Sequence, residues 1–326
     1  VQVQVLVGQP VLLIKEVKVK VFSGNSNRSL AEKIAKYLGI ELGEMEITRF
    51  PDGEICAQII DSIRGEDVFI IQSICNPPNE NLMELLIIID AMKRASPSRI
   101  TAVVPYYGYA RQDRKDRPRV PITAKLVANL LVAAGTNRLL TMDLHAQQIQ
   151  GFFDIPVDHL YASPVIVKYL KEATFENPVI VAPDVGGVKA AYAYSRMLGC
   201  GLAIIAKQRK SAFDVEALTI VGDVKNCTAI MVDDLTTTGG TLCAGAELLR
   251  QYGAKKVYAA VTHAPLTPEG LKKLKKSPLE ELIVTDTIPL NNIEGFPIKI
   301  LSVADLLGEA IRRINENKSI NSLFKL

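Results

Sequence analysis

A pattern of apolar strand, polar loop and helix occurs twice in this chain, and this repeat constrains the fold more than any other feature. Residues 17–39 read VKVKVFSGNSNRSLAEKIAKYLG, and residues 178–199 read PVIVAPDVGGVKAAYAYSRMLG. Both copies end with Leu-Gly, where glycine suits the left-handed residue that closes a helix. Short β-rich runs that alternate with helices are typical of a parallel sheet covered by helices.

A second repeat follows each copy of the first. VFIIQS at 68–73 and TAIMVDD at 228–234 each lead through a loop and a helical stretch to a further apolar run. The separation from 68 to 228 is close to that from 17 to 178, and both exceed the period of a solenoid. The sequence therefore predicts two similar α/β domains. Duplication is one explanation of the repeat, and the general self-similarity of α/β proteins is the other.

The predicted domain boundary lies near residues 160–164. We expect an N-terminal domain over residues 15–161, a C-terminal domain over residues 162–305, and a final helix and tail over residues 306–326. A chain of 326 residues suits two domains of ordinary size. The apolar segment 1–14 lacks the positive region of a signal peptide and is assigned no function. A trimmed precursor is an open alternative, because the chain begins with Val1.

Composition excludes several classes of function. A net charge of +3 argues against nucleic-acid binding by bulk electrostatics, and no apolar run reaches the roughly 18–20 residues of a membrane helix. The five cysteines are odd in number and form no C-x-x-C pair. They indicate reduced thiols in a cytosol-like compartment. We therefore expect a cytoplasmic protein, with organellar import of a longer precursor left open.

The sharpest local motif is IMVDDLTTTGGT at residues 230–241. An apolar strand delivers two acids, Asp233 and Asp234, to a loop of threonines and glycines that opens a helix. Glycines let backbone N–H groups approach a phosphate, and a helix N-terminus favours negative charge. The acids can accept hydrogen bonds from ribose hydroxyls or help to hold magnesium. The motif resembles the phosphoribosyl-pyrophosphate loop shared by type I phosphoribosyltransferases and ribose-phosphate pyrophosphokinases.

Further segments resemble the ribose-phosphate pyrophosphokinases specifically, and they occur in the order found in that family. They cover roughly residues 17–315, so the resemblance spans nearly the whole chain. It implies two phosphoribosyltransferase-like domains, each a mainly parallel sheet flanked by helices, with the C-terminal region helping to close the N-terminal domain. The segments are RFPDGE at 49–54, PYYGYARQDRKDRPRVPITAK at 105–125, DLHAQQIQGFFDIPVD at 143–158, PDVGGVK at 183–189 and KQR at 207–209.

The charged run 111–117 predicts either a solvated loop or a nucleotide site. Arginine pairs with phosphate oxygens in a bidentate manner, and glutamine can contact a purine edge. The resemblance favours the nucleotide site, since it implies that the side chains of Arg111 and Gln112 contact ATP. It implies the same for Asp52, Gly53 and Glu54, which a neighbouring subunit usually contributes.

Taken alone, His145 is more typical of a packed or surface histidine than of a metal ligand. The resemblance implies instead that His145 and Asp184 hold the magnesium ion that accompanies ATP. Magnesium prefers oxygen ligands and keeps several waters, so we expect the imidazole to be a secondary or water-bridged ligand. His159 and His263 are given no catalytic role.

Lys207 and Arg209 follow an apolar strand, and alternate residues of an extended segment point the same way. They form either a solvated cluster or a pair of cations that face one site. The resemblance implies that both are catalytic and lie on a flexible flap. It also implies a ribose 5-phosphate site formed by Arg209, Asp233, Asp234, Thr237, Thr238, Gly239, Gly240 and Thr241.

The sequence departs from the family at two places. The family usually has aspartate at the position of Thr237, and losing that carboxylate removes negative charge near a phosphate. Tighter ribose 5-phosphate binding and altered metal geometry are both open consequences. The segment KSAFDVEAL after Arg209 also lacks the proline-rich pattern of many bacterial members, so flap dynamics do not carry over.

The implied enzyme is a ribose-phosphate diphosphokinase, which transfers the pyrophosphoryl group of Mg-ATP to the 1-hydroxyl of ribose 5-phosphate. The products are 5-phosphoribosyl 1-pyrophosphate, a precursor for nucleotide biosynthesis, and AMP. The resemblance also implies the phosphate-activated class, with a homohexamer, activation by phosphate and inhibition by ADP. Two alternatives stay open: a non-catalytic regulatory paralogue and a phosphoribosyltransferase.

Overall fold

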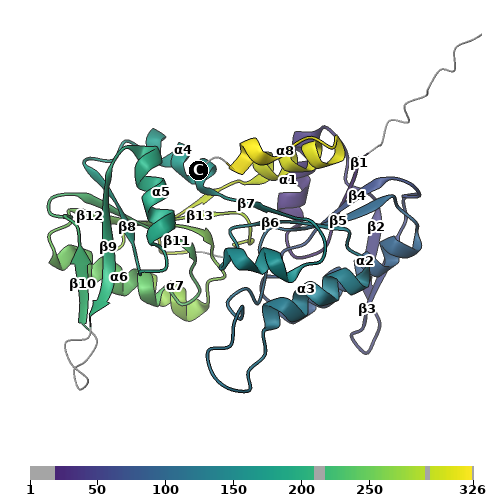
Figure 1. The fold of residues 1–326 in the computed structure, drawn as a ribbon, viewed down its shortest axis with the longest axis horizontal. Coiled ribbons are helices and arrows are strands. Elements are labelled where there is room, and N and C mark those ends of the chain that lie inside the picture. Colours follow the sequence, from purple (N-terminus) through teal and green to yellow (C-terminus); the bar gives the residue numbers. More distant parts are fainter. Residues whose placement is uncertain (1–18, 209–216, 291–293, 325–326) are drawn as a thin grey trace, which may run out of the picture.

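The computed structural model describes residues 19–208, 217–290 and 294–324. Within them, two β-sheets lie between two layers of helices (Figure 1). One layer contains α1 (Arg28–Leu38), α4 (Ser163–Glu172), α5 (Val188–Leu198) and α8 (Ala304–Asn315), and the other contains α2 (Pro78–Arg94), α3 (Thr123–Ala134), α6 (Gly240–Gln251) and α7 (Pro268–Leu274). Two short 3-10 helices lie at Gln147–Phe152 and Asn321–Phe324.

The N-terminal sheet has five parallel strands, which lie in the order in which they occur in the chain. They are β1 (Val19–Ser23), β4 (Asp67–Ile71), β5 (Arg99–Val104), β6 (Arg138–Met142) and β7 (Val157–Leu160). Strands β2 (Met45–Arg49) and β3 (Ile55–Ile59) form a separate antiparallel hairpin.

The C-terminal sheet has seven strands in the order β10-β9-β8-β11-β12-β13-β14. They are β8 (Pro178–Ala182), β9 (Gly201–Gln208), β10 (Ala217–Val221), β11 (Thr228–Leu235), β12 (Lys256–His263), β13 (Glu281–Thr285) and β14 (Ile298–Leu301). Only β9 and β10 pair in antiparallel fashion. Strands β8, β11, β12, β13 and β14 repeat the parallel order of the N-terminal sheet. In the sequence, the hairpin β2–β3 lies between β1 and β4, and the hairpin β9–β10 lies between β8 and β11.

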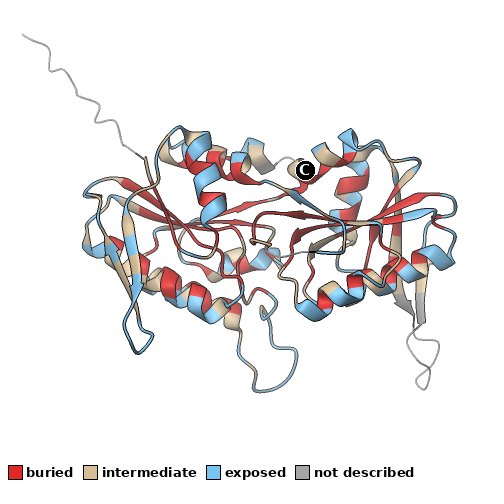
Figure 2. Cartoon of the chain, turned by 180° about the vertical axis from the view of Figure 1, so that it is seen from behind, coloured by how far each residue is buried: buried red, intermediate tan, exposed pale blue. Residues whose placement is uncertain are grey.

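Both faces of each sheet are buried, which explains why the central strands are almost continuously apolar. Alternate residues of β4 enter different cores: Phe69 and Ile71 face the layer of α1 and α8, whereas Val68 and Ile70 lie under α2 and α3. Buried residues accordingly concentrate in the strands and on the inner faces of the helices (Figure 2). The predicted α/β class is confirmed.

The two halves share one hydrophobic core because each packs its last helix against the other half. Helix α4 follows β7 and packs against α5, whereas α8 follows β14 and packs against α1. Leu30 of α1, Ile166 of α4 and Leu307 of α8 all belong to the same buried cluster. None of the described helices combines the length and apolar character needed to cross a membrane.

Candidate active site

The carboxyl ends of β8, β9 and β11 meet at one edge of the C-terminal sheet. Strand β8 pairs with β9 on one side and with β11 on the other. The strands that follow β8 in the chain therefore lie first on one side of it and then on the other. Such a switch point leaves a crevice outside the strand ends, where α/β proteins bind ligands. Asp184 follows β8, Asp233 and Asp234 end β11, and Lys207 lies near the end of β9.

The flap predicted at Lys207 and Arg209 is described only in part. The backbone of Lys207 pairs with Leu218 of β10 and lies three residues beyond Ile204, which is the partner of Ala182 in β8. This register places the Lys207 backbone beyond the strand end that leads to Asp184. The position of its side chain is not described, and Arg209 lies outside the described residues.

The loop at 236–239 connects β11 to α6 and has the geometry expected for anion binding. Gly239 adopts a left-handed φ of 65° at the N-cap and makes no side-chain cap, so the first N–H groups of α6 are left for a ligand. The hydroxyl oxygen of Thr237 is buried and has no hydrogen-bond partner among the described residues.

His145 and Asp234 connect the two halves of the chain at this loop. His145 Nδ1 lies 2.7 Å from Asp234 Oδ2. This hydrogen bond to Asp234 raises the pKa of His145, against the effect of burial. Burial would raise the pKa of Asp234, but the hydrogen bond and charge of His145 hold it below its usual range. Burial and the charge of Asp234 raise the pKa of Asp233. The pair therefore brings an imidazole and a carboxylate together between the nucleotide candidates and the phosphate loop.

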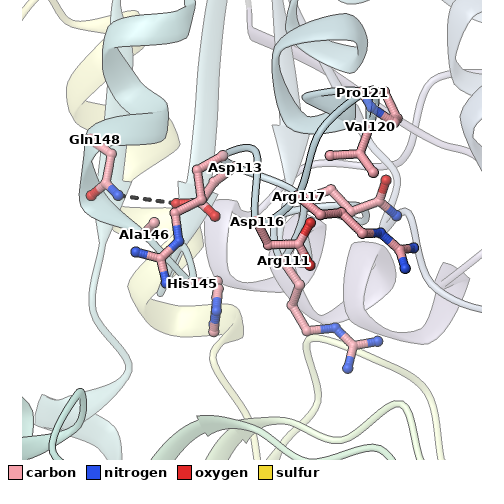
Figure 3. A pocket seen from close by; sticks show the side chains of 11 residues that line it. Arg111, Asp113, Asp116, Arg117, Val120, Pro121, His145, Ala146 and Gln148 are labelled. Carbon is pink, nitrogen blue, oxygen red and sulfur yellow. Dashed lines mark hydrogen bonds between the residues drawn. The ribbon is translucent and has the colours of Figure 1, made fainter.

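An open pocket of about 580 Å³ adjoins His145, a volume typical of small-molecule sites. Arg111, Gln112 and His145 all line it, so the structure brings these three predicted residues together. The guanidinium of Arg111 and the imidazole of His145 extend toward the same side of the pocket (Figure 3). Gln148 Nε2 donates to Asp113 Oδ2 at 3.1 Å across the pocket wall.

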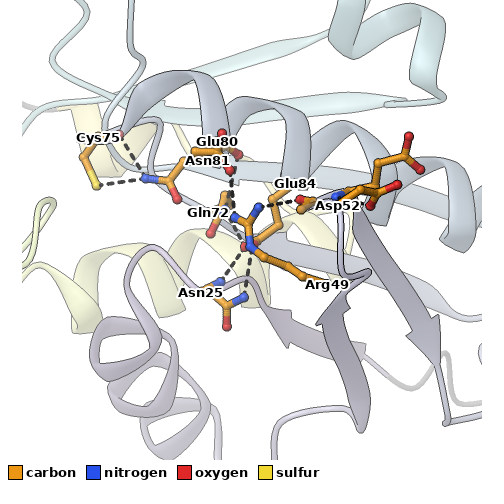
Figure 4. A network of polar contacts seen from close by, with 10 residues as sticks. Asn25, Arg49, Asp52, Gln72, Cys75, Glu80, Asn81 and Glu84 are labelled. Atoms are coloured by element: carbon orange, nitrogen blue, oxygen red, sulfur yellow. Dashed lines mark hydrogen bonds and ion pairs between the residues drawn. The ribbon is translucent and has the colours of Figure 1, made fainter.

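Asp52, Gly53 and Glu54 are not part of this pocket. They form the turn of the β2–β3 hairpin at the outer edge of the N-terminal half. Arg49 fixes the turn by donating to the carbonyl of Gly53 at 2.9 Å and pairing with Glu80 of α2 at 2.7 Å (Figure 4). Within one chain, the turn and the pocket remain apart.

The two predicted magnesium ligands differ in their surroundings. His145 faces Asp234, whereas Asp184 is exposed and accepts a hydrogen bond from the N–H of Gly187 at 2.9 Å. Among the described residues, no group of three histidine, cysteine or acidic side chains has the arrangement of a metal site. One or two protein ligands still suit magnesium, which takes its remaining ligands from phosphates and water.

The sequence motifs assign no role to three titratable residues around this site: Asp143, which is half-buried, and His159 and His263, which are buried. Burial raises the pKa of Asp143 to about 6, and it lowers the pKa of each histidine to about 4. In the sequence, the only signal of a role for Asp143 is its position two residues before His145. Nothing in the sequence distinguishes the two histidines, because their burial depends on strands from different halves.

Comparison with known proteins identifies the family. The model of the N-terminal domain of ribose phosphate pyrophosphokinase matches residues 19–135, and that of the phosphoribosyl synthetase-associated domain matches residues 213–325. A ribose-phosphate pyrophosphokinase of Nostoc sp. is 53% identical over 310 residues, which cover 94% of each chain. The chain belongs to the ribose-phosphate pyrophosphokinase family.

Other members of the ribose-phosphate pyrophosphokinase family extend this similarity. The relative from Campylobacter jejuni is 53% identical over 306 residues, covering 94% of this chain and 98% of its own. The crystal structure of phosphoribosylpyrophosphate synthetase from Mycobacterium smegmatis superposes with a TM-score of 0.87 at 43% identity, covering 92% of this chain and 99% of its own. The predicted family and its enzymatic class are therefore confirmed.

Proposed function

We propose that this chain transfers the pyrophosphoryl group of Mg-ATP to the 1-hydroxyl of ribose 5-phosphate, with 5-phosphoribosyl 1-pyrophosphate and AMP as products. The contact between His145 and Asp234 carries the proposal. His145 lines the pocket that contains Arg111 and Gln112, and Asp234 lies at the end of β11, which leads into the phosphate loop. One continuous site thus joins a nucleotide pocket to a sugar-phosphate loop.

The loop from Asp233 to Thr241 is the proposed site of ribose 5-phosphate. The N–H groups at the start of α6 and the hydroxyls of Thr237, Thr238 and Thr241 would donate to the 5-phosphate. Asp233 and Asp234 would accept hydrogen bonds from the ribose hydroxyls. Gly239 and Gly240 allow the backbone to approach the phosphate, and Arg209 is proposed to add a further contact.

Arg111 and Gln112 are the proposed ATP contacts within the chain. Asp52, Gly53 and Glu54 are proposed to complete the site of a neighbouring copy, because their turn lies outside the pocket of their own chain. This arrangement suits an ATP site that combines residues of two subunits, and the proposed assembly is a homohexamer. Inorganic phosphate and ADP are the proposed effectors. Five free cysteines support a cytoplasmic location.

Magnesium is the proposed metal, held by His145 and Asp184 together with substrate oxygens. Magnesium retains several waters and would take its remaining ligands from phosphate oxygens. When bound, the ion neutralises charge on the transferring phosphates.

The reaction is proposed to proceed by in-line attack of the 1-hydroxyl on the β-phosphorus of ATP, with AMP as the leaving group. Phosphoryl transfer depends mainly on positioning and charge neutralisation. The phosphate loop holds the sugar, and the pocket at Arg111 holds the nucleotide. Lys207 and Arg209 are proposed to stabilise the negative charge on the transferring group and on AMP.

Product formation by the purified chain tests this proposal. ATP, Mg²⁺ and ribose 5-phosphate should yield AMP and 5-phosphoribosyl 1-pyrophosphate in equal amounts without a nucleobase. Dependence on phosphate and inhibition by ADP are measured in the same assay. AMP formation that does not depend on ribose 5-phosphate would contradict the proposal. A folded chain without turnover would favour the regulatory paralogue, and consumption of 5-phosphoribosyl 1-pyrophosphate with a base would favour a phosphoribosyltransferase.

A further inference from the structure

We propose that His159 and His263 are positioning residues that fix the segment 142–144, and through it His145, against the phosphate loop. We call these two side chains the histidine clamp. The inference rests on the proposed function and adds residues that act through His145 without touching substrate.

His263 reaches the segment from the C-terminal half. It ends β12 and is 2% exposed. Its Nε2 lies 3.1 Å from the carbonyl oxygen of Met142 and 3.3 Å from that of Asp143. Carbonyl oxygens only accept, so Nε2 carries the hydrogen and Nδ1, which lies 2.9 Å from Thr287 Oγ1, is the acceptor. The ring therefore donates to the carbonyls of Met142 and Asp143, which lie three and two residues before His145.

His159 holds the same segment from the N-terminal half. It lies in β7 and is 4% exposed. Its Nε2 accepts a hydrogen bond from the N–H of Leu144 at 2.9 Å. One histidine thus binds carbonyls of the segment and the other binds an N–H, which fixes the orientation of the two successive peptide groups between Met142 and Leu144.

The backbone at Asp143 needs such support. Its φ of 37° is left-handed, which is uncommon for a residue with a side chain. Asp143 Oδ2 accepts from Thr262 Oγ1 at 2.6 Å and from the N–H of Ala162 at 2.9 Å. Thr262 directly precedes His263, so the end of β12 holds both the side chain and the main chain of Asp143.

The same strand end also holds the phosphate loop. The carbonyl oxygen of His263 accepts from the N–H of Thr236 at 3.0 Å. Its main chain therefore fixes the ribose 5-phosphate side, while its ring fixes the side of His145. Replacing the ring should disturb His145 and leave the loop in place. This separation gives the inference a kinetic signature.

His263→Leu removes the donor, whereas His263→Gln carries an amide nitrogen that can replace Nε2. We expect kcat of the Leu variant to fall roughly 10- to 100-fold, since misplacement by about 1 Å has costs of this size. KM for ribose 5-phosphate should stay within about threefold, and the Gln variant should recover most of kcat. Leu30→Ala, a core change in α1, controls for general destabilisation. A large rise in KM for ribose 5-phosphate with unchanged kcat would contradict the inference.

A double-mutant cycle with His145→Ala identifies the route of the effect. If the clamp acts through His145, adding His263→Leu to His145→Ala should lower kcat no further. Multiplicative losses would overturn the inference. Should the Leu variant not fold, Thr262→Val removes one hydroxyl with little change of shape, and the same lack of additivity is expected.

The tests separate the inference from the proposed function. A wild-type chain that forms no AMP would contradict the proposed function. A crystal structure of the Leu variant decides the inference without activity: His145 displaced from Asp234 supports it, and His145 still at its wild-type distance contradicts it.

Discussion

Gly270 of α7 lies directly against the carbonyl of Thr237 in the phosphate loop. A Cβ built on Gly270 would lie 2.6 Å from that oxygen and 3.1 Å from the Cα of Thr238. The N–H of Thr267, at the N-cap of the same helix, donates to the same carbonyl at 3.0 Å. Helix α7 therefore supports the loop by close backbone contact, which only glycine permits at position 270.

Gly270→Ala should displace this loop. Adding one methyl group to a tightly packed contact typically costs about 1–3 kcal/mol, and loop displacement should raise KM for ribose 5-phosphate at least about tenfold. Steady-state kinetics with varied ribose 5-phosphate measure the effect. Gly151→Ala is the control, because a Cβ there meets no atom within 4 Å. Equal KM values for both variants would show that α7 does not fix the loop.

Lys207→Ala should lower kcat by at least about 10²-fold, the loss typical when one donor to a developing negative charge is removed. The prediction rests on the end of β9, which lies at the same sheet edge as Asp184 and Asp233. Single-turnover AMP release measures the chemical step. Lys256→Ala, at the exposed start of β12, is the matched control. Near-wild-type turnover of the Lys207 variant would contradict the proposed catalytic role of Lys207.

The histidine clamp should make the protein sensitive to mild acid. Burial lowers the pKa of His159 from 6.5 to about 4, so the folded state favours the neutral ring. This contribution is complete above pH 6.5 and is lost as pH falls toward 4. His159→Gln cannot be protonated, so its unfolding free energy should fall less than wild type between pH 7.5 and pH 5, by roughly 2 kcal/mol. Urea unfolding at both pH values checks this, and parallel pH profiles would contradict it.

Arg99→Ala should destabilise the chain without affecting the chemistry. Asp67 is 2% exposed, and Arg99 pairs with it while also donating to the carbonyl of Ile314 in α8 at 2.9 Å. Removing one partner of a buried pair typically costs about 3–5 kcal/mol. Arg94→Ala breaks an exposed pair with Asp90 and should change stability far less, because solvent screens that pair. Denaturant midpoints compare the two, and equal midpoints would contradict the prediction.

Much of the candidate site follows from sequence because its motifs are local. The loop at 236–239 requires a preceding strand, a glycine that can adopt a positive φ and a following helix. All three depend on residues that are close together in the sequence. The placement of Arg111 and Gln112 in a pocket with His145 also agrees with the predicted nucleotide site. The metal and substrate roles remain proposals, and the side chain of Lys207 and all of Arg209 lie outside the described positions.

The sequence by itself determined the α/β class, the repeated halves and the family, because periodicity, caps and motifs depend on residues close together in the chain. Only the tertiary structure decided that α4 packs against α5 and α8 against α1, since the choice of partner helix depends on which apolar faces fit together. It also decided that His145 meets Asp234, 89 positions away, and that His159 and His263 hold the same short segment. Burial makes those hydrogen bonds specific, because a polar group in the core has no water to replace a lost partner.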